Sequence, residues 1–302
     1  MSASRPTILV FELDPRGGKL LGDALASAGF RFGPLTHAQW QARGEGVVAS
    51  LYRSGKLVVQ GRDSEAFRAR FLRGSRPVGG AVDTSDLPPA AGALGSDEAG
   101  KGDTFGPLCV AAVAVDAQAA EELAAAGVAD SKTLTDPRVL ALAAHFAERV
   151  PHERRVLPPE EYHAAWIAAG RNVNRLLTRL HAECLAALRE RTGFAVAVVD
   201  RFAADSPVSA ELARRAPGLR VIEVPRAERH LATAAASVLA RAAFLDGLAA
   251  LEQHWATDLP AGSGTPVGPA LRRFTEIHGR AALGQVAKIH FQNVRRFLAD
   301  GR

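Results

Sequence analysis

The stretch GSDEAGKGDTFGPLCVAAV (residues 95–113) joins a cluster of glycines and charged residues to an apolar run. Small and β-branched side chains fill residues 107–115, which predicts a strand buried on both faces. The spacing G-x4-G-K approximates a phosphate-binding loop, but Gly102 stands where that loop needs Ser or Thr. Two carboxylates, Asp97 and Glu98, would also repel a phosphate held by backbone N–H groups. We therefore reject the phosphate-loop interpretation.

The pair of carboxylates instead favours a cation. Mg²⁺ prefers oxygen ligands, and two such ions can hold the attacking and leaving oxygens of a phosphodiester displacement. An isolated Asp-Glu pair is more often a solvated turn. Neighbouring strand residues also point to opposite faces, so Asp97 and Glu98 can serve one site only where the strand ends or bulges. The glycines at positions 100, 102 and 106 provide such a break.

From residue 94 onward the sequence has the pattern of an α/β domain. Apolar runs at 194–202 and 218–224 predict two more strands, and Asp200 lies near the end of the first. Ligands gather at the ends of strands in such sheets, so an acid in this place is a candidate site residue. Helical periodicity is present near 117–126, 136–149, 172–192 and 228–254.

The first 74 residues form a separate pattern, which we interpret as a small β-α-β-β-α domain. Phe67, Phe71 and Leu72 are expected to pack on its sheet. Residues 75–92 are rich in Gly, Pro, Ser and Ala without periodicity, and predict a linker to a second domain over 93–302. The expected elements of the first domain are a strand over 7–13, a helix over 17–30, a hairpin over 46–52 and 56–61, and a helix over 63–74.

Composition favours a cytoplasmic protein. The chain has 302 residues, 47% of them apolar, and we expect no membrane span. The start, MSASRPTILVFELD, lacks the basic region and apolar core of a secretory signal. Cys109 and Cys184 are the only cysteines, and their apolar contexts predict two buried, reduced thiols.

Positive charge is concentrated at the N-terminus. Residues 1–76 contain 12 Lys and Arg against 6 Asp and Glu, a balance of +6, whereas the remainder contains 25 against 26, a balance of −1. Such a surplus suggests a polyanionic partner for the first segment. An ordinary solvated surface is the alternative.

Motifs along the chain resemble those of the type 2 ribonucleases H. The stretch 95–113 resembles the first motif of this family, and its G-K-G and DTFGPL resemble ribonuclease HIII more than ribonuclease HII, where the middle residue is typically Arg. The N-terminal segment with YRSGKLVVQG (52–61) resembles the TBP-like domain of most ribonuclease HIII proteins. Five further segments resemble later motifs of the family: ADSKTLTD (129–136), VVDRFA (198–203), RAERHLATAAASVLAR (226–241), LPAGSG (259–264) and VAKIHFQN (286–293).

This resemblance covers nearly the whole chain and implies both a fold and a reaction. The implied α/β fold is a ribonuclease H-like mixed sheet flanked by helices, preceded by a small TBP-like α+β domain. The resemblance also implies that Asp97, Glu98, Asp200 and Glu228 bind Mg²⁺ or Mn²⁺. They would activate a water that cuts the RNA strand of an RNA/DNA hybrid, leaving 3′-hydroxyl and 5′-phosphate ends. Considered singly, Asp200 is an ordinary strand-end acid and Glu228 an ordinary first-turn helix acid.

The same resemblance assigns substrate contacts. Gly100, Lys101 and Gly102 would let the backbone approach a ribose, whose 2′-hydroxyl distinguishes RNA from DNA, while the lysine meets a phosphate. By resemblance, Ser131 and Lys132 would contact the backbone of the nucleic acid. Without the resemblance they would be residues of an ordinary turn.

Other polar residues receive no catalytic role. Asn172 and Asn174 match an Asn-rich helix start of the family, but Ala182 stands where another Asn is expected, so we assign no substrate contact to that helix. Three histidines lack metal-ligand spacing with one another and are interpreted as structural or surface residues: His181, His278 and His290.

Two alternatives stay open. The closest is ribonuclease HII activity at a single ribonucleotide in duplex DNA, which would use the same fold. The other is a catalytically silent hybrid-binding protein. The four acids argue against it, because clustered negative charge does not help a protein to bind phosphates. Of these possibilities we favour an enzyme that cleaves RNA/DNA hybrids. We expect it to be a monomer and to have no membrane partner.

Overall fold

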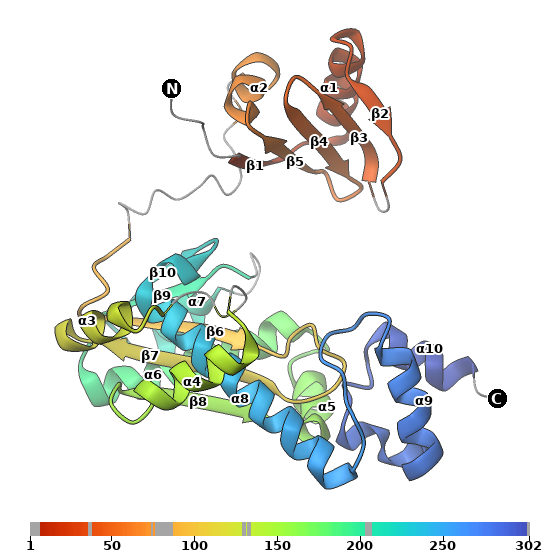
Figure 1. The fold of residues 1–302 in the computed structure, drawn as a ribbon. Helices are drawn as coiled ribbons and strands as arrows, with labels where there is room; N and C mark the ends of the chain where they lie inside the picture. The colour runs from red at the N-terminus through yellow and green to blue at the C-terminus, as the bar shows by residue number, and fades with distance from the viewer. Residues whose placement is uncertain are drawn as a thin grey trace. The chain divides into compact units, whose positions relative to one another are not determined.

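The computed structural model describes residues 7–35, 38–73, 75, 87–128, 131, 134–202 and 207–300. The chain divides into two compact units, residues 1–83 and 84–302, and each is described by itself (Figure 1). The division falls within segment 75–92, most of which lies outside the described residues.

The N-terminal unit is an antiparallel sheet with both helices on one face. Leu9 and Phe11, alternate residues of the first strand, are buried in one core with Leu25 and Phe67 of the helices. The strand order is β1-β5-β4-β3-β2. The elements are β1 (Thr7–Glu12), α1 (Pro15–Ser27), β2 (Arg31–Gly33), β3 (Ala38–Gly44), β4 (Val47–Tyr52), β5 (Lys56–Gly61) and α2 (Ser64–Phe71).

The prediction of a β-α-β-β-α unit was wrong in one respect: it lacked strands β2 and β3, which lie between α1 and β4. Strand β3 reads AQWQARG, with few of the β-branched residues that mark a strand, and β2 has three exposed residues. Pairing with β4 holds β3 in the sheet despite its composition. The packing prediction for the last helix is confirmed: Phe67 and Leu72 are buried, and Phe71 packs partly buried against the same core.

The C-terminal unit is built on a mixed sheet of strand order β10-β9-β6-β7-β8. Strands β10, β9 and β6 are parallel, whereas β7 is antiparallel to both of its neighbours. The strands are β6 (Ala93–Ala99), β7 (Leu108–Val115), β8 (His152–Leu157), β9 (Val196–Asp200) and β10 (Arg220–Val224). The helices are α3 (Ala117–Ala125), α4 (Asp136–Phe146), α5 (Pro159–Ala168), α6 (Val173–Thr192), α7 (Val208–Arg215), η3 (Ala227–Arg229), α8 (Leu231–Trp255), α9 (Val267–His278), η4 (Arg280–Gln285) and α10 (Gln292–Asp300).

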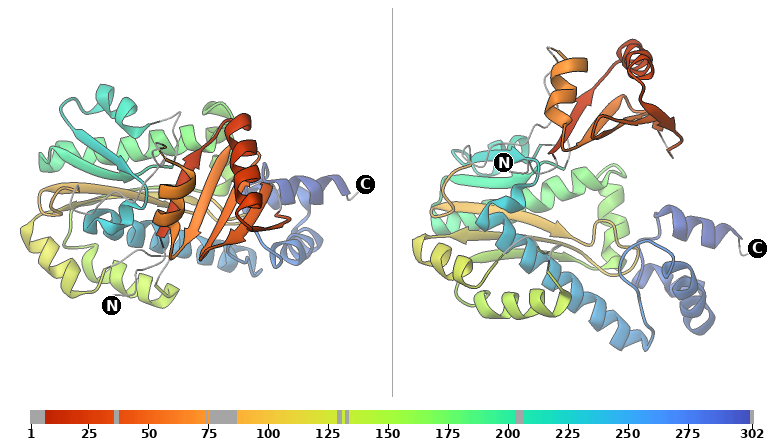
Figure 2. Two further views of the ribbon diagram at one scale, coloured as in Figure 1. Left: turned by 90° about the horizontal axis from the view of Figure 1, so that it is seen from above. Right: turned by 45° about the horizontal axis from the view of Figure 1, so that its top comes forward.

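Helices cover both faces of this sheet. Helices α6 and α7 pack on one face, and α8, α4 and α3 pack on the other (Figure 2). Strand β7 alternates between the two cores, with Ala112 in the first and Val113 in the second. All eight of its residues are buried, which confirms the predicted doubly buried strand. Phe105 and Phe274 belong to a third core, which joins α9, η4 and α10 to the end of α8.

Helix α8 lies unusually close to β6. A Cβ placed on Gly95 would lie 2.2 Å from the backbone carbon of Ala232, so only glycine permits this approach. By length and composition α8 is the one helix of the described residues that could cross a membrane, but 61% of its most apolar window is buried inside the unit. That burial is expected of a central core helix. Cys109 and Cys184 are buried and free, as predicted, and burial raises the pKa of each thiol to about 12.

Candidate active site

The site lies where two central strands separate. Strand β6 pairs with β9 only as far as Ser96 opposite Val199, but pairs with β7 as far as Ala99. Asp97 and Asp200 are therefore the first residues of their strands beyond the shared ladder. Because the two strands diverge at that level, space opens between them for side chains of both.

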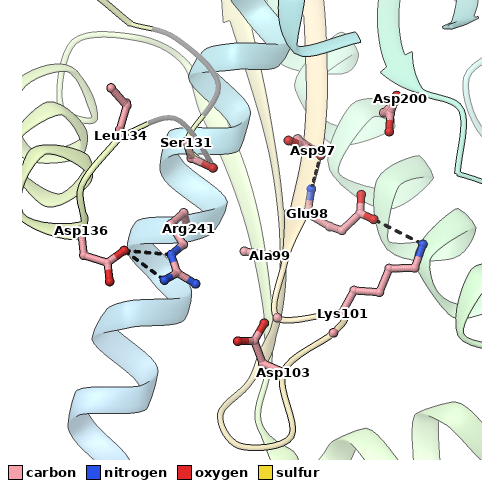
Figure 3. Close-up of a pocket in the computed structure, with 12 residues that line it drawn as sticks. Asp97, Glu98, Ala99, Lys101, Asp103, Ser131, Leu134, Asp136, Asp200 and Arg241 are labelled. Atoms are coloured by element: carbon pink, nitrogen blue, oxygen red, sulfur yellow. Dashed lines mark hydrogen bonds and ion pairs between the residues drawn. The ribbon is translucent and has the colours of Figure 1, made fainter. Parts of the chain in front are cut away.

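A cavity of about 500 Å³ occupies this position, and Asp97, Glu98 and Asp200 all line it (Figure 3). Asp97 pairs with a residue on the α8 face of β7, whereas Glu98 pairs with a residue on the α6 face. The strand gives way to Gly100, whose φ of 85° is left-handed. Asp97 and Glu98, neighbours near the end of β6, both line this cavity, and their sharing of one functional site stays a prediction.

The first two acids are held by local contacts. The backbone N–H of Glu98 donates to Oδ1 of Asp97 at 2.9 Å, and Asp97 is only 5% exposed. Lys101 lies with its Nζ 3.6 Å from Oε1 of Glu98 and 5.1 Å from the centre of the Phe202 ring. The ammonium group of Lys101 therefore lies at the edge of a cavity lined by carboxylates.

His181 of α6 is completely buried beneath Glu98. Its Nε2 lies 3.2 Å from Oε2 of Glu98 and its Nδ1 lies 2.5 Å from Oγ of Ser96. The two contacts are compatible with one arrangement, in which Nε2–H donates to the carboxylate and the Ser96 hydroxyl donates to Nδ1. The interpretation of His181 as structural missed this positioning role. Ser96 and Glu98 are alternate residues of β6, so both face α6, but no local pattern identifies His181 as their partner.

Asp200 is hydrogen-bonded to the backbone segment that contains Glu228 and leads into α8. The N–H of Ala227 donates to Oδ1 of Asp200 at 3.4 Å, a long contact. Glu228 follows in η3, half-buried, and is not among the residues that line the cavity. Within the described residues, no three His, Cys, Asp or Glu side chains already form a metal-binding group. The fold brings three of the four predicted acids into one cavity and holds the fourth beside Asp200.

The predicted Gly-Lys-Gly loop also lines the cavity. A Cβ on Gly100 would lie 2.2 Å from the Pro107 carbonyl oxygen, so the loop closes tightly only with glycine there. Gly102 has open space where a Cβ would stand. A ligand can therefore approach the backbone at Gly102 without meeting a side chain.

Of the predicted backbone-contact pair, Ser131 lines the cavity and Lys132 lies outside the described residues. The Ser131 hydroxyl lies 2.6 Å from that of Ser237 on α8. Asp136 and Arg241, which the sequence did not single out, form an ion pair at 3.0 Å on the same wall. Asn172, of the Asn-rich helix start, caps α6 by accepting from Asn174 N at 2.9 Å and from Arg175 N at 3.2 Å.

The C-terminal segment clamps the loop that follows the acids. Lys288 is 1% exposed, and its Nζ donates to the carbonyl oxygens of Asp103 (2.9 Å), Gly106 (2.7 Å) and Pro107 (3.4 Å). Burial lowers the pKa of Lys288 to about 8. Asn293 adds a bond from Nδ2 to Oγ1 of Thr104 at 2.9 Å. The VAKIHFQN segment therefore has a structural reason to accompany the acidic motif.

The donor set suits a hard divalent cation. Every acid brought to the cavity offers carboxylate oxygens, whereas the nearby histidine is engaged by Ser96 and Glu98. Oxygen-only donors are those that Mg²⁺ and Mn²⁺ prefer.

Comparison with known proteins agrees with this geometry. The family model described as Ribonuclease HII matches residues 94–294, more than half of the chain. The chain therefore belongs to the ribonuclease HII family, whose fold is the ribonuclease H-like mixed sheet flanked by helices.

Full-length relatives narrow the assignment within that family. Ribonuclease HIII of Chlamydia abortus is 37% identical over 95% of this chain and 96% of its own, and ribonuclease HIII of Protochlamydia amoebophila is 34% identical over 99% and 98%. The crystal structure of Bst-RNase HIII in complex with Mn²⁺ aligns with a TM-score of 0.63 at 31% identity, over 98% of this chain and 99% of its own. Within the family, the chain groups with the ribonuclease HIII endoribonucleases.

Proposed function

We propose that this protein is a metal-dependent endonuclease that hydrolyses the RNA strand of RNA/DNA hybrids to 3′-hydroxyl and 5′-phosphate ends. One observation carries the proposal: Asp97, Glu98 and Asp200 line one cavity where β6 and β9 separate. A pure binding surface for phosphates would gain nothing from this concentration of negative charge. The Mn²⁺ complex of Bst-RNase HIII supports the metal dependence.

Asp97, Glu98, Asp200 and Glu228 would hold Mg²⁺ or Mn²⁺. When bound there, such an ion lowers the pKa of a water nucleophile and stabilises the charge that develops on the phosphate. His181 keeps the Glu98 carboxylate oriented by donating to Oε2. The contact between Ala227 and Asp200 holds the start of α8, and with it Glu228, next to the strand end.

The substrate contacts proposed for the loop rest on its backbone. Gly102 has open space where a side chain would stand, which suits recognition of a ribose 2′-hydroxyl, and Gly100 lets the loop close tightly beside it. Lys101 is placed to meet a phosphate as a point charge next to the acids. Ser131 belongs to the same wall, and Lys132 follows it in sequence.

The N-terminal unit is proposed to bind the hybrid without contributing residues to the hydrolysis. Residues 1–74 form the TBP-like substrate-binding domain in this proposal, 75–92 the linker and 93–302 the catalytic domain. The excess positive charge of the chain lies in the first 76 residues, which contain none of the four acids. We further predict a cytoplasmic monomer, which cell fractionation and light scattering can check.

The decisive experiment uses end-labelled substrates with Mg²⁺ or Mn²⁺: an RNA/DNA hybrid, a DNA duplex with one ribonucleotide, and pure DNA and RNA duplexes. We expect rapid cutting of the hybrid and much slower cutting at the single ribonucleotide. Asp97→Asn should be inactive, whereas Asp136→Asn, which alters another carboxylate of the same cavity, should stay active. Equal rates on both ribonucleotide-containing substrates would assign ribonuclease HII-type activity instead. Tight hybrid binding without cleavage would assign the silent binding protein.

A further inference from the structure

A second cavity, of about 370 Å³, lies between α5 and the segment that follows η4. Among the described residues that line it, none is acidic and four are basic. Burial, followed by the neighbouring charges of His163, Lys288 and Arg295, lowers the pKa of His290, as expected where positive potential accumulates. The lining residues are His163, Trp166, Ile167, Arg171, Ile289, His290 and Arg295.

Stacked rings make one wall of this cavity rigid. The rings of Trp166 and His290 stack with centroids 4.4 Å apart and 26° between their planes, and His163 stacks on Trp166 at 5.7 Å. Among the described residues, the buried Nδ1 atoms of His163 and His290 have no hydrogen-bond partner. Each of these two rings therefore keeps one nitrogen that the described residues do not engage.

Arg171 reaches the cavity from a strained turn. Its φ is 58°, and the preceding Gly170 has a φ of 71°. A long side chain rarely adopts this left-handed conformation, and strain of this kind is concentrated at functional sites. A glycine at 171 would avoid the strain but would remove the guanidinium.

The cavity is connected to the active-site loop through Lys288. That lysine binds three carbonyls of the loop, and it precedes His290 by two residues, a span of at most about 7 Å. His290 of this cavity is therefore tied, through the main chain, to the lysine that clamps the loop following the acids.

We propose that this basic cavity binds a backbone phosphate of the nucleic acid that occupies the active site, with the adjoining sugar or base against Trp166. The proposal rests on the proposed function for its choice of ligand. Guanidinium groups suit phosphate oxygens by geometry as well as charge, and aromatic rings beside them are typical of strand-binding grooves.

The test is hybrid binding by the full-length protein, measured by fluorescence anisotropy without divalent metal at several salt concentrations. The variant Arg171→Gln/Arg295→Gln should raise Kd about tenfold and reduce the slope of log affinity against log salt by about 0.9, because one phosphate contact is lost. Arg296→Gln is the matched control, since Arg296 is the adjacent exposed arginine of α10 and does not line the cavity. The hybrid should quench the fluorescence of the wild type more than that of Trp166→Phe, which retains Trp40 and Trp255.

A double variant that binds like Arg296→Gln would overturn the proposal. So would quenching of Trp166 by adenosine monophosphate combined with unchanged hybrid affinity, which would assign the cavity to free nucleotides. Arg295 is exposed on a helix, so Arg295→Gln alone, with an expected threefold effect, still decides the matter if the double variant fails to fold. Normal binding by wild type without hybrid cleavage would reject the proposed function and leave the phosphate site standing.

Discussion

The two ends of the loop over residues 100–107 handle buried charge in opposite ways. At one end Asp97, 5% exposed, lines a cavity with four further carboxylates, those of Glu98, Asp103, Asp136 and Asp200. At the other end Lys288, 1% exposed, is surrounded by backbone carbonyls within 3.4 Å. The lysine is matched by fixed dipoles of the fold, whereas the acids are gathered with like charges. The buried lysine is hydrogen-bonded by the fold at the cost of a lowered pKa, whereas the acids are concentrated where a bound cation would offset their charge.

Removing a charge at the acidic end should have the largest effect on activity. Asp97→Asn is expected to lower kcat for hybrid cleavage about a thousandfold or more, because a metal ligand and its charge are lost. Unfolding midpoints and hybrid affinity should change little, since repulsion among the acids is relieved. Single-turnover rates with Asp136→Asn as control measure this, and near-native turnover would refute the metal-site hypothesis.

Removing the charge at the lysine end should instead affect stability. Lys288→Met leaves three carbonyls without their donor and is expected to lower the free energy of unfolding by about 2–4 kcal/mol. The pKa of Lys288 is lowered from 10.5 to about 8 in the fold, so the unfolded chain binds more protons between these values. Stability of the wild type should therefore rise with pH across that window, by up to about 3 kcal/mol relative to the variant.

Urea titrations of both proteins at pH 7, 8, 9 and 10 test this prediction. The gap between wild type and Lys288→Met should widen above pH 8. A gap independent of pH would mean that the lysine is not the titrating group.

Deleting residues 1–74 sharpens the comparison, because neither end of the loop belongs to that unit. We expect KM for hybrid to rise about tenfold and kcat to change much less, since phosphate contacts but no acids are lost. The salt dependence of affinity should also become shallower. Equal affinity and equal salt slope for the full-length and truncated proteins would show that the positive charge is only a solvated surface.

The smallest effect is expected at the ion pair on the cavity wall. The side chains of Arg241 and Asp136 are 25% and 52% exposed, and solvent screens such pairs. Arg241→Gln should lower stability by less than about 1 kcal/mol and hybrid cleavage by about twofold. A loss of cleavage comparable to that of Asp97→Asn would instead place Arg241 in the chemistry.

Local patterns were sufficient for the central elements. Strand β7 is apolar at every position, and the strand before Asp200 is similarly continuous, so hydrophobic content alone predicts both. Strand β8, which reads HERRVL, was not predicted, because it is an edge strand whose charged residues are tolerated by solvent. Edge strands of this kind are defined by their neighbour rather than by their own pattern.

The four acids were predicted from a family resemblance. The residues that hold the acids and their loop in place, His181 and Lys288, were not predicted from any local pattern. His181 lies 83 residues from Glu98 in sequence, and Lys288 lies 182 residues from Gly106. Nothing in the residues around either position indicates its partner, because the contact exists only after the helices pack on the sheet. The same holds for the basic cavity, whose walls come from α5 and the C-terminal segment.

The pairing of β6 with β9 has a consequence for synthesis of the chain. Ala93 pairs with Val196, which is 103 positions later in the chain. Gly106 accepts a hydrogen bond from Lys288, which is 182 positions after Gly106. At about 5–20 residues per second, a ribosome needs roughly 10–35 s to supply that lysine after the glycine has been made. For about the first half of this interval the nascent chain lacks β9, and for all of it the chain lacks the lysine that closes its loop. A chain released before β9 is made would therefore contain Asp97 and Glu98 without Asp200.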